Sequence, residues 1–348
     1  MSEWKEYRLG DVGKIVTGKT PKTAITDNYG GNIPFLSPSD NMELKYVPIT
    51  ARHLTEKGLA EVKSCLIPEN SVCVSCIGSD MGKSVITVRP IVTNQQINSI
   101  IPSSNFDTNF LYYILQNKKR EIKFLGMNGT AVPILNKSAF SNLTILAPEL
   151  DEQRSIASIL SSLDSKIENN RKICANLEAQ AQALFKHWFI DFAPFKDGKF
   201  VESELGMIPQ GWEVTTIGKV CKCELGGTPS RANKSYWGGN IAWINSGEVN
   251  KFRICQASEY ITDEGLSHSA TKLLPAKTTV LAITGATLGQ VSLLEINSCA
   301  NQSVVGIKEN GQIPYTFIYP LIKSRIKELI LMQTGGAQQH INKDNIQS

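Results

Sequence analysis

The sequence lacks the features that mark membrane, exported and disordered proteins. No run of 18 apolar residues occurs among its 348 residues, so no membrane-spanning helix is expected. The N-terminus, Met1–Lys5, has no basic region followed by an apolar stretch, so no signal peptide is expected. With 41% hydrophobic and 20% charged residues, the composition predicts a folded, soluble, cytoplasmic protein of about two domains.

Residue sets for catalysis and metal binding are also missing. None of the four histidines has a metal-binding spacing; they are His53, His187, His268 and His340. Neither an adenine-methyltransferase motif of the form (N/D)PP(Y/F) nor a nuclease carboxylate–lysine set occurs. Gly82-Lys83-Ser84 resembles the end of a phosphate-binding loop, but the spacing to the preceding glycine is wrong. We therefore expect no metal, no cofactor and no catalysis by this chain alone.

The eight cysteines are scattered, which favours reduced thiols in a cytoplasmic chain. Cys73 and Cys76 form a C-x-x-C pair, a spacing found in zinc and redox sites. They lie in the apolar run 71–77, which is typical of a buried strand, and no second pair completes four ligands. The strand interpretation is therefore favoured over the zinc or redox one.

One unit occurs twice in the chain. WKEYRLGDVGKIVTGKTP at 4–21 matches WEVTTIGKVCKCELGGTP at 212–229, an offset of 208 residues. The match continues in order through GGNI (30–33 and 238–241), NQ (94–95 and 301–302) and NK (136–137 and 342–343). Only two one-residue shifts occur over about 140 positions, which indicates duplicated domains because stacked repeats have much shorter periods. The Gly-Gly-Asn segments are interpreted as turns.

Each unit is predicted to be strand-rich, with one helix towards its end. Runs of β-formers predict strands at 72–77, 84–88, 280–284 and 291–294. Helical periodicity predicts helices at 109–119 and 315–327. The fold class is therefore α+β, with globular domains at 1–148 and 194–348.

A long coiled-coil-type helix is predicted between the units, from Asp151 to about Lys186, within a linker of 149–193. Acidic residues after Pro148 favour its start through the helix dipole. Apolar and small residues form a heptad seam: Ile156, Leu160, Leu163, Ile167, Asn170, Cys174, Leu177, Ala181 and Leu184. About 35 residues give roughly 50 Å of helix, and so narrow a stripe favours a partner helix over a face of its own domain.

An aromatic cluster follows the seam, and Pro194 is expected to stop the helix. The cluster fits either a partner surface or a hinge packed against a unit, and the sequence leaves both open. The predicted partner or helix interface comprises Ile156, Leu160, Leu163, Ile167, Asn170, Leu177, Leu184, Phe185, Phe189 and Phe192.

Taken in order, these segments resemble the specificity subunits of type I restriction–modification systems. The matching motifs are the WxxxxLG(D/K)V opening of each half, the GxTP turn, the segments YGGNIPFL and YWGGNIAWI, and the glycine-spaced strand ending in NQ. The segment 148–153 with Ile156 and Leu163-Asp164, and the segment 184–195, also look like the family's spacer and linker. The resemblance covers essentially the whole chain.

The resemblance implies a non-catalytic reader of DNA. Each unit would be a target recognition domain for one half of a bipartite, asymmetric target, and the helix would set the gap between the halves. The implied partners are type I methyltransferase subunits, which methylate adenine at N6, and type I restriction subunits. S-adenosylmethionine, ATP and Mg²⁺ are expected only on those partner subunits.

The chain departs from the family pattern at its C-terminus. In the family each recognition domain is followed by a long helix, and the two helices pair antiparallel. The offset places the start of a second helix near position 359, beyond Ser348. We therefore expect the second spacer helix to be absent, and three interpretations stay open: a fragment, a truncated variant, or a helix supplied by another chain.

Contact with DNA is expected from local patches, because the net charge is only +4 and no basic tail exists. Positions where the two copies differ inside shared loops are the candidates, since two half-sites generally differ. In the first unit these are Lys19, Thr20, Lys22, Thr23, Ser37, Ser39, Asp40, Ser79, Lys83, Asn128 and Thr130. In the second unit they are Thr228, Ser230, Arg231, Lys234, Asn245, Ser246, Glu248, Thr287, Gln290, Gln338, Gln339 and His340. A turn cap or solvated loop residue is the alternative at each position.

Two other functions fit parts of the sequence. A coiled-coil protein–protein scaffold with two β-rich binding modules is mildly favoured by the low net charge. An enzyme of carbohydrate or nucleotide metabolism is disfavoured by the missing catalytic set. Neither predicts sequence-dependent binding of DNA.

Overall fold

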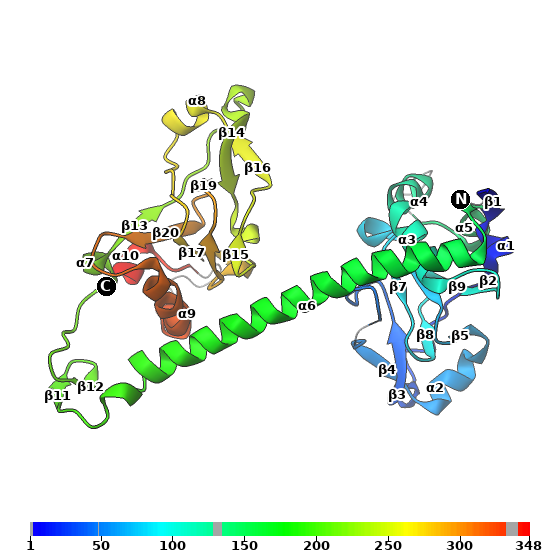
Figure 1. Cartoon of the computed structure of the whole chain (residues 1–348), viewed down its shortest axis with the longest axis horizontal. Helices are drawn as coiled ribbons and strands as arrows, with labels where there is room; N and C mark the ends of the chain where they lie inside the picture. The colour runs from blue at the N-terminus through cyan, green and yellow to red at the C-terminus, as the bar shows by residue number, and fades with distance from the viewer. Residues whose placement is uncertain (1–2, 48, 128–133, 332–339) are drawn as a thin grey trace. The chain divides into compact units, whose positions relative to one another are not determined.

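A computed structural model describes residues 3–47, 49–127, 134–331 and 340–348. The chain divides into two compact units, which we call unit 1 (residues 1–171) and unit 2 (residues 172–348). The division falls inside one long helix, α6 (Leu150–Phe189), so each unit includes part of that helix (Figure 1). None of the described helices has the length and apolarity needed to cross a bilayer.

Unit 1 contains two four-stranded sheets and a two-stranded ribbon. The first sheet has the antiparallel order β2-β9-β6-β7, formed by β2 (Gly13–Thr17), β6 (Val72–Ser75), β7 (Ser84–Ile86) and β9 (Ile97–Pro102). The second has the order β4-β3-β8-β5, formed by β3 (Tyr29–Leu36), β4 (Arg52–Leu54), β5 (Leu66–Ile67) and β8 (Ile91–Thr93). The ribbon pairs β1 (Lys5–Arg8) with β10 (Thr144–Ala147), so the first and last strands of the unit meet just before α6.

Helices cover the first sheet of unit 1. The α-helices are α1 (Leu9–Val12), α2 (Glu56–Glu61), α3 (Thr108–Asn117), α4 (Lys119–Gly126) and α5 (Lys137–Ser141), and the 3-10 helices are η1 (Thr26–Asn28), η2 (Lys63–Cys65) and η3 (Gly78–Asp80). Asp107 caps α3 by accepting a hydrogen bond from the backbone of Phe110 (2.9 Å). Leu111 and Leu115 on α3 are buried with Val72 and Val74 of β6 in the largest apolar cluster of the unit. The helix predicted at 109–119 is thereby confirmed.

Unit 2 repeats this plan. Its main sheet has the order β13-β20-β17-β18-β15, with β13 (Cys221–Leu225), β15 (Arg253–Ile254), β17 (Thr279–Ala282), β18 (Val291–Leu294) and β20 (Val304–Glu309). The second sheet has the order β16-β14-β19, with β14 (Trp237–Ile244), β16 (Glu259–Ile261) and β19 (Ser298–Ala300). A hairpin of β11 (Phe200–Ser203) and β12 (Gly206–Pro209) precedes them.

The remaining elements of unit 2 are helical. They are α7 (Ile217–Val220), α8 (Asp263–Ser267), α9 (Tyr315–Leu331), α10 (Lys343–Gln347), η4 (Ala193–Phe195), η5 (Lys234–Tyr236), η6 (Ser246–Glu248) and η7 (Gly285–Thr287). Ile318 and Ile322 on α9 are buried with Leu281 of β17 and Val305 of β20. Because α9 covers its sheet as α3 covers the first sheet of unit 1, the predicted duplication and the α+β class are confirmed.

The Gly-Gly-Asn segments are not turns, which corrects the interpretation from sequence. They lie inside the long strands β3 and β14, whose pairing with β4 and β16 is interrupted by a bulge at the same place in both units. The first glycine has a left-handed backbone in each case, with φ +87° at Gly30 and +82° at Gly238. One type of bulge has a residue in this conformation, and glycine adopts it without strain.

The C-x-x-C pair belongs to the buried first sheet of unit 1. Cys73 lies within β6 and its sulfur accepts a hydrogen bond from Ser99 on β9 (3.2 Å). Cys76 follows the strand and is held by the amide of Asn98 (3.2 Å). Burial raises the pKa of Cys73 to about 12 and that of Cys76 to about 11, so both are held as neutral thiols. This agrees with the strand interpretation.

Helix α6 confirms the predicted spacer helix and is longer than predicted, with 40 residues. At 1.5 Å per residue its length is about 60 Å. Pro194 does not stop it, which corrects that prediction. The helix ends at Phe189, and the backbone of Phe192 is left-handed (φ 52°), so the chain turns before the proline is reached. Lys186 in the last turn contacts both carboxylate oxygens of Asp191 at 2.7 Å.

The predicted heptad seam is mostly exposed on α6. Leu163 is 56% exposed and Leu177 is 58% exposed, and Ile167 and Leu184 are similar. Only its first two members, Ile156 and Leu160, are half-buried, against unit 1. The seam therefore remains a prediction for a partner helix.

A neighbouring stripe of α6 makes the contacts to the units. It consists of Gln153, Ala157, Ser161 and Asp164 in unit 1 and of Glu178, Gln182, Phe185 and Phe189 in unit 2, and each of these is buried or half-buried. Ala157 is only 3% exposed and Phe185 only 6%. The residues between these groups, from 169 to 177, are all exposed.

The aromatic cluster after the seam packs within unit 2. The ring of Phe185 lies 5.1 Å from that of Phe317 on α9, and Phe189 lies 5.0 Å from the same ring. Phe192 packs edge-on against Trp212 at 5.3 Å. Of the two possibilities left open by the sequence, the structure supports the hinge packed against its unit, so Phe185 belongs to a core rather than to a free partner surface.

Candidate nucleic-acid interface

Three loops of unit 1 meet where strands β2, β3 and β8 end. We call them the β2 loop (residues 18–25), the β3 loop (37–40) and the NQ loop (94–96). The backbone N–H of Lys19 donates to Thr93 O (2.9 Å), and that of Asn94 donates to Leu36 O (2.9 Å). The Thr20 hydroxyl donates to the side-chain carbonyl of Gln95 (2.6 Å). Two of the predicted DNA-binding segments, the β2 loop and the β3 loop, therefore adjoin one another through the NQ loop.

A third predicted segment joins them through the backbone. The loop between β6 and β7, which carries Ser79 and Lys83, begins at Cys76, whose N–H donates to Gln96 O (2.9 Å). Cys76 O in turn accepts from the N–H of Leu135 (3.0 Å), in the segment that follows residues 128–133. Asn128 and Thr130 themselves lie outside the described residues.

Unit 2 forms the same arrangement with different side chains. Gly227 N donates to Ala300 O (2.8 Å), Asn301 N donates to Ile244 O (3.0 Å), and Thr228 Oγ1 donates to Gln302 Oε1 (2.5 Å). His340 pairs with Thr284, beside Thr287 and η7. Gln338 and Gln339 lie outside the described residues.

The candidates differ in how free their side chains are. Exposed ones are Lys19, Lys22, Thr23, Ser39, Ser79, Thr228, Ser230, Arg231 and Lys234. Half-buried ones are Thr20, Asp40, Lys83, Asn245, Ser246, Glu248, Thr287, Gln290 and His340, and Ser37 is buried. The exposed group lies mainly in the β2 loop and its counterpart in unit 2, so these two loops carry the most accessible donors.

The acidic candidates Asp40 and Glu248 already have backbone partners. Asp40 accepts from the N–H groups of Ser37 and Ala51, both at 2.8 Å. Glu248 accepts from those of Asn245 (3.0 Å) and Ser258 (2.9 Å). Each carboxylate therefore fixes the turn after its long strand, and the alternative of a turn cap describes both in the free protein.

Lys83 is likewise engaged. Its Nζ lies 2.7 Å from carboxylate oxygens of both Glu43 and Asp80. The hydrogen bond to Asp80, then the one to Glu43, raises the pKa of Lys83, so it stays charged. A contact with a phosphate would have to compete with these two carboxylates.

Arg231 is the most strongly organised candidate. Its guanidinium forms two parallel hydrogen bonds of 2.7 Å to the carboxylate of Glu259. It also lies 3.7 Å from the ring centre of Trp237 and 5.2 Å from that of Trp243. An arginine fork held by a carboxylate and an aromatic face is fixed in direction, and three of its five N–H donors remain for another ligand.

Sequence reasoning missed the corresponding cation in unit 1, Arg52. Arg52 pairs with Phe35 across β3 and β4 as Glu259 pairs with Trp243 across β14 and β16. Its guanidinium lies 4.9 Å from the Phe35 ring, and the side chain is exposed. Each unit thus places an arginine over the same aromatic position, from different segments. The signal in the sequence is the offset of 207, which aligns Arg52 with Glu259, the partner of Arg231.

Comparison with known proteins identifies the family. The model of the type I restriction modification DNA specificity domain matches residues 1–179 and 209–348. The chain belongs to this family. It is therefore a DNA sequence-recognition protein of a type I restriction–modification system, and the scaffold alternative is not supported.

Individual specificity subunits agree over most of their length. The chain is 28% identical over 355 residues to the type I restriction enzyme MjaIX specificity subunit of Methanocaldococcus jannaschii, covering 99% of this chain and 82% of that protein. It is 24% identical to the HindI specificity subunit of Haemophilus influenzae, covering 97% and 86%. The fold is similar to the crystal structure of a type I S subunit from M. genitalium, with a TM-score of 0.51 and 15% identity over 94% of this chain and 78% of that one.

Proposed function

We propose that this specificity subunit reads a split, asymmetric DNA target, one half with each unit. The observation that carries the proposal is the repeated loop arrangement: both units bring the same four segments together but differ in the side chains they present. A common framework with different donors suits two half-sites of different sequence. The β2 loop and its counterpart, with Arg52 and Arg231, supply the accessible cations.

The same proposal makes the chain a recruiter rather than an enzyme. Methylation of adenine would come from partner methyltransferase subunits that bind S-adenosylmethionine, and cleavage from restriction subunits that use ATP and Mg²⁺. This chain would contribute the recognition of the target DNA sequence and the surface on which those partners assemble.

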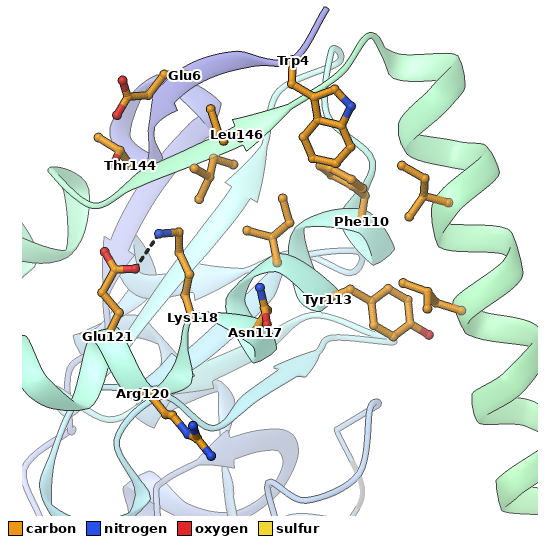
Figure 2. Close-up of a pocket in the computed structure, with 14 residues that line it drawn as sticks. Trp4, Glu6, Phe110, Tyr113, Asn117, Lys118, Arg120, Glu121, Thr144 and Leu146 are labelled. Atoms are coloured by element: carbon orange, nitrogen blue, oxygen red, sulfur yellow. Dashed lines mark hydrogen bonds and ion pairs between the residues drawn. The ribbon is translucent and has the colours of Figure 1, made fainter. Parts of the chain in front are cut away.

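The exposed seam of α6 supports a further helix in the assembly. A groove of about 900 Å³ in unit 1 adjoins it, lined by Trp4, Phe110, Leu146 and Ile156 among others (Figure 2). In unit 2 the aligned pair, Trp212 and Phe317, is covered by the aromatic end of α6. A partner helix with a similar aromatic end would fill the groove and cover the seam.

Mapping of methylated adenines tests the proposal. The chain would be co-expressed with its cognate methyltransferase in a host without other adenine methylation, and the genome sequenced for N6-methyladenine. We expect one motif with two unlike halves separated by a fixed number of unspecified bases. The chain without the methyltransferase serves as the control and should give no methylation. A continuous motif, or methylation by the chain alone, would contradict the proposal.

A further inference from the structure

Unit 1 is attached to α6 through a tyrosine and a carboxylate. Tyr113 on α3 points towards α6 (Figure 2), and its hydroxyl donates to Asp164 on that helix at 2.5 Å. Lys45 Nζ donates to the Tyr113 hydroxyl (3.0 Å) and to the Ser161 hydroxyl on α6 (2.8 Å). The same ammonium lies 4.6 Å from the Tyr113 ring centre. Burial, then the bond to Asp164, raises the pKa of Tyr113, so the phenol keeps its proton.

Unit 2 is attached to α6 by the same chemistry. Tyr319 on α9 donates its hydroxyl to Glu178 on α6 at 2.7 Å, and Lys323 forms an ion pair with the same carboxylate. Phe252 packs on the Tyr319 ring at 5.4 Å, where unit 1 has Lys45. The Glu178 side chain is only 14% exposed, so solvent screens this contact weakly.

The two contacts are not simply inherited from the duplicated unit. At the offset of 207, Tyr319 aligns with Tyr112, one residue before Tyr113. The lysine also differs in origin, because Lys45 comes from a loop and Lys323 from α9 itself. Both units nevertheless place a tyrosine hydroxyl, a lysine and an α6 carboxylate together.

The two carboxylates occupy the same stripe of α6. Asp164 and Glu178 are 14 residues, or two heptads, apart, and each follows a seam residue, Leu163 or Leu177. Sliding by one residue along a helix turns the contact by about 100° and moves it by about 1.5 Å. The flanking positions 163, 165, 177 and 179 carry Leu, Ser, Leu and Ala, so no neighbouring carboxylate could replace either one. Each contact therefore excludes a slide of one residue along α6.

We propose that Tyr113–Asp164 and Tyr319–Glu178 are matched clamps that fix the rotation of each recognition unit about α6, and so set the number of base pairs permitted between the half-sites. This rests on the proposed split recognition. One base pair turns B-DNA by about 34°, since a helical turn holds 10–10.5 base pairs. A unit free to swivel on α6 by this angle would accept a gap longer or shorter by one base pair.

The test uses hydroxyl-deletion variants, Tyr113→Phe and Tyr319→Phe, in the full chain bound to its methyltransferase. Matched controls are Tyr46→Phe, whose ring lies 5.5 Å from Lys45 but which is exposed, and Tyr315→Phe on the same helix as Tyr319. Affinity is measured for DNA with the native gap, with the gap changed by one base pair either way, and with one half-site scrambled.

The clamp variants should lose about tenfold of the discrimination between native and altered gaps, as expected for one charge-assisted hydrogen bond. Their affinity for DNA with one scrambled half-site should stay within about twofold of the unsubstituted chain, and the controls should match that chain throughout. Asp164→Asn added to Tyr113→Phe should cause no further loss, because both remove the same contact.

Three outcomes would overturn the inference, and they can be told apart. If the unsubstituted chain ignores gap length, split recognition fails and the clamps fail with it. If it discriminates but the clamp variants discriminate equally well, only the clamps fail. If the variants weaken every DNA equally, the tyrosines support the fold and do not set the gap.

Discussion

At the scale of single residues, fixed direction distinguishes the best candidates from the rest. The carboxylate oxygens of Asp40 and Glu248 accept hydrogen bonds from backbone N–H groups. Arg231, in contrast, is oriented by Glu259 and Trp237, and its side chain is still exposed. Exposed ion pairs add little stability, so the Arg231–Glu259 pair is better explained by orientation than by folding. Glu259 has its pKa lowered, chiefly by the hydrogen bond from Arg231, and remains charged.

Replacing Arg231 by Ala should therefore weaken binding to DNA that carries the second half-site by about 1–3 kcal/mol. For DNA in which that half-site is scrambled, the affinity of the variant should fall only by the amount expected from the loss of one positive charge. Fluorescence anisotropy at several salt concentrations measures both effects. Arg325→Ala, an exposed arginine of α9 paired with Glu328, is the control and should leave discrimination intact. Equal affinities for Arg231→Ala and the unsubstituted chain would remove Arg231 from the interface.

At the scale of elements, the sequence predicts what repeats locally and misses what depends on tertiary packing. The duplication, the strands around β6 and β17, and α6 were all predictable, because hydrophobic periodicity and glycine spacing are local signals. The bulge in β3 stands where a turn is expected, since Gly-Gly-Asn serves both. The end of α6 at Phe189 and the stripe of α6 that contacts the units were not predictable, because both depend on which face of α6 the units cover.

Two adjacent residues of α6 provide a test of that face. Phe185→Ala removes a buried ring that packs on Phe317 and should lower the free energy of unfolding by about 3–5 kcal/mol. Leu184→Ala, on the exposed seam, should change it by less than about 0.5 kcal/mol. Urea unfolding followed by tryptophan fluorescence measures both. An equally large loss for Leu184→Ala would mean that the seam is covered in the chain alone as well as the stripe.

At the scale of the whole molecule, duplication divides recognition into exchangeable parts. The order of the four strands that the two main sheets share, the bulged long strand and the loop junctions are the same in both units. The units differ in the added strand β15, in loop side chains and in how they hold α6. The residues that unit 2 uses to pack the end of α6, Trp212 and Phe317, align with Trp4 and Phe110 of unit 1. The framework of unit 1 therefore has the ring positions needed to stand in the place of unit 2.

A chimera in which residues 4–137 replace their counterparts in unit 2 should accordingly read the same half-site sequence twice. Because Tyr112 aligns with Tyr319, we expect it to take the place of Tyr319 beside Glu178. Lys323 is lost in the exchange, since its aligned residue is Gln116, so the gap should be less strictly defined than in the native chain. Methylome sequencing with the cognate methyltransferase reads both properties at once. Two unlike halves in the motif of the chimera would show that the half-site sequence is set outside the exchanged loops.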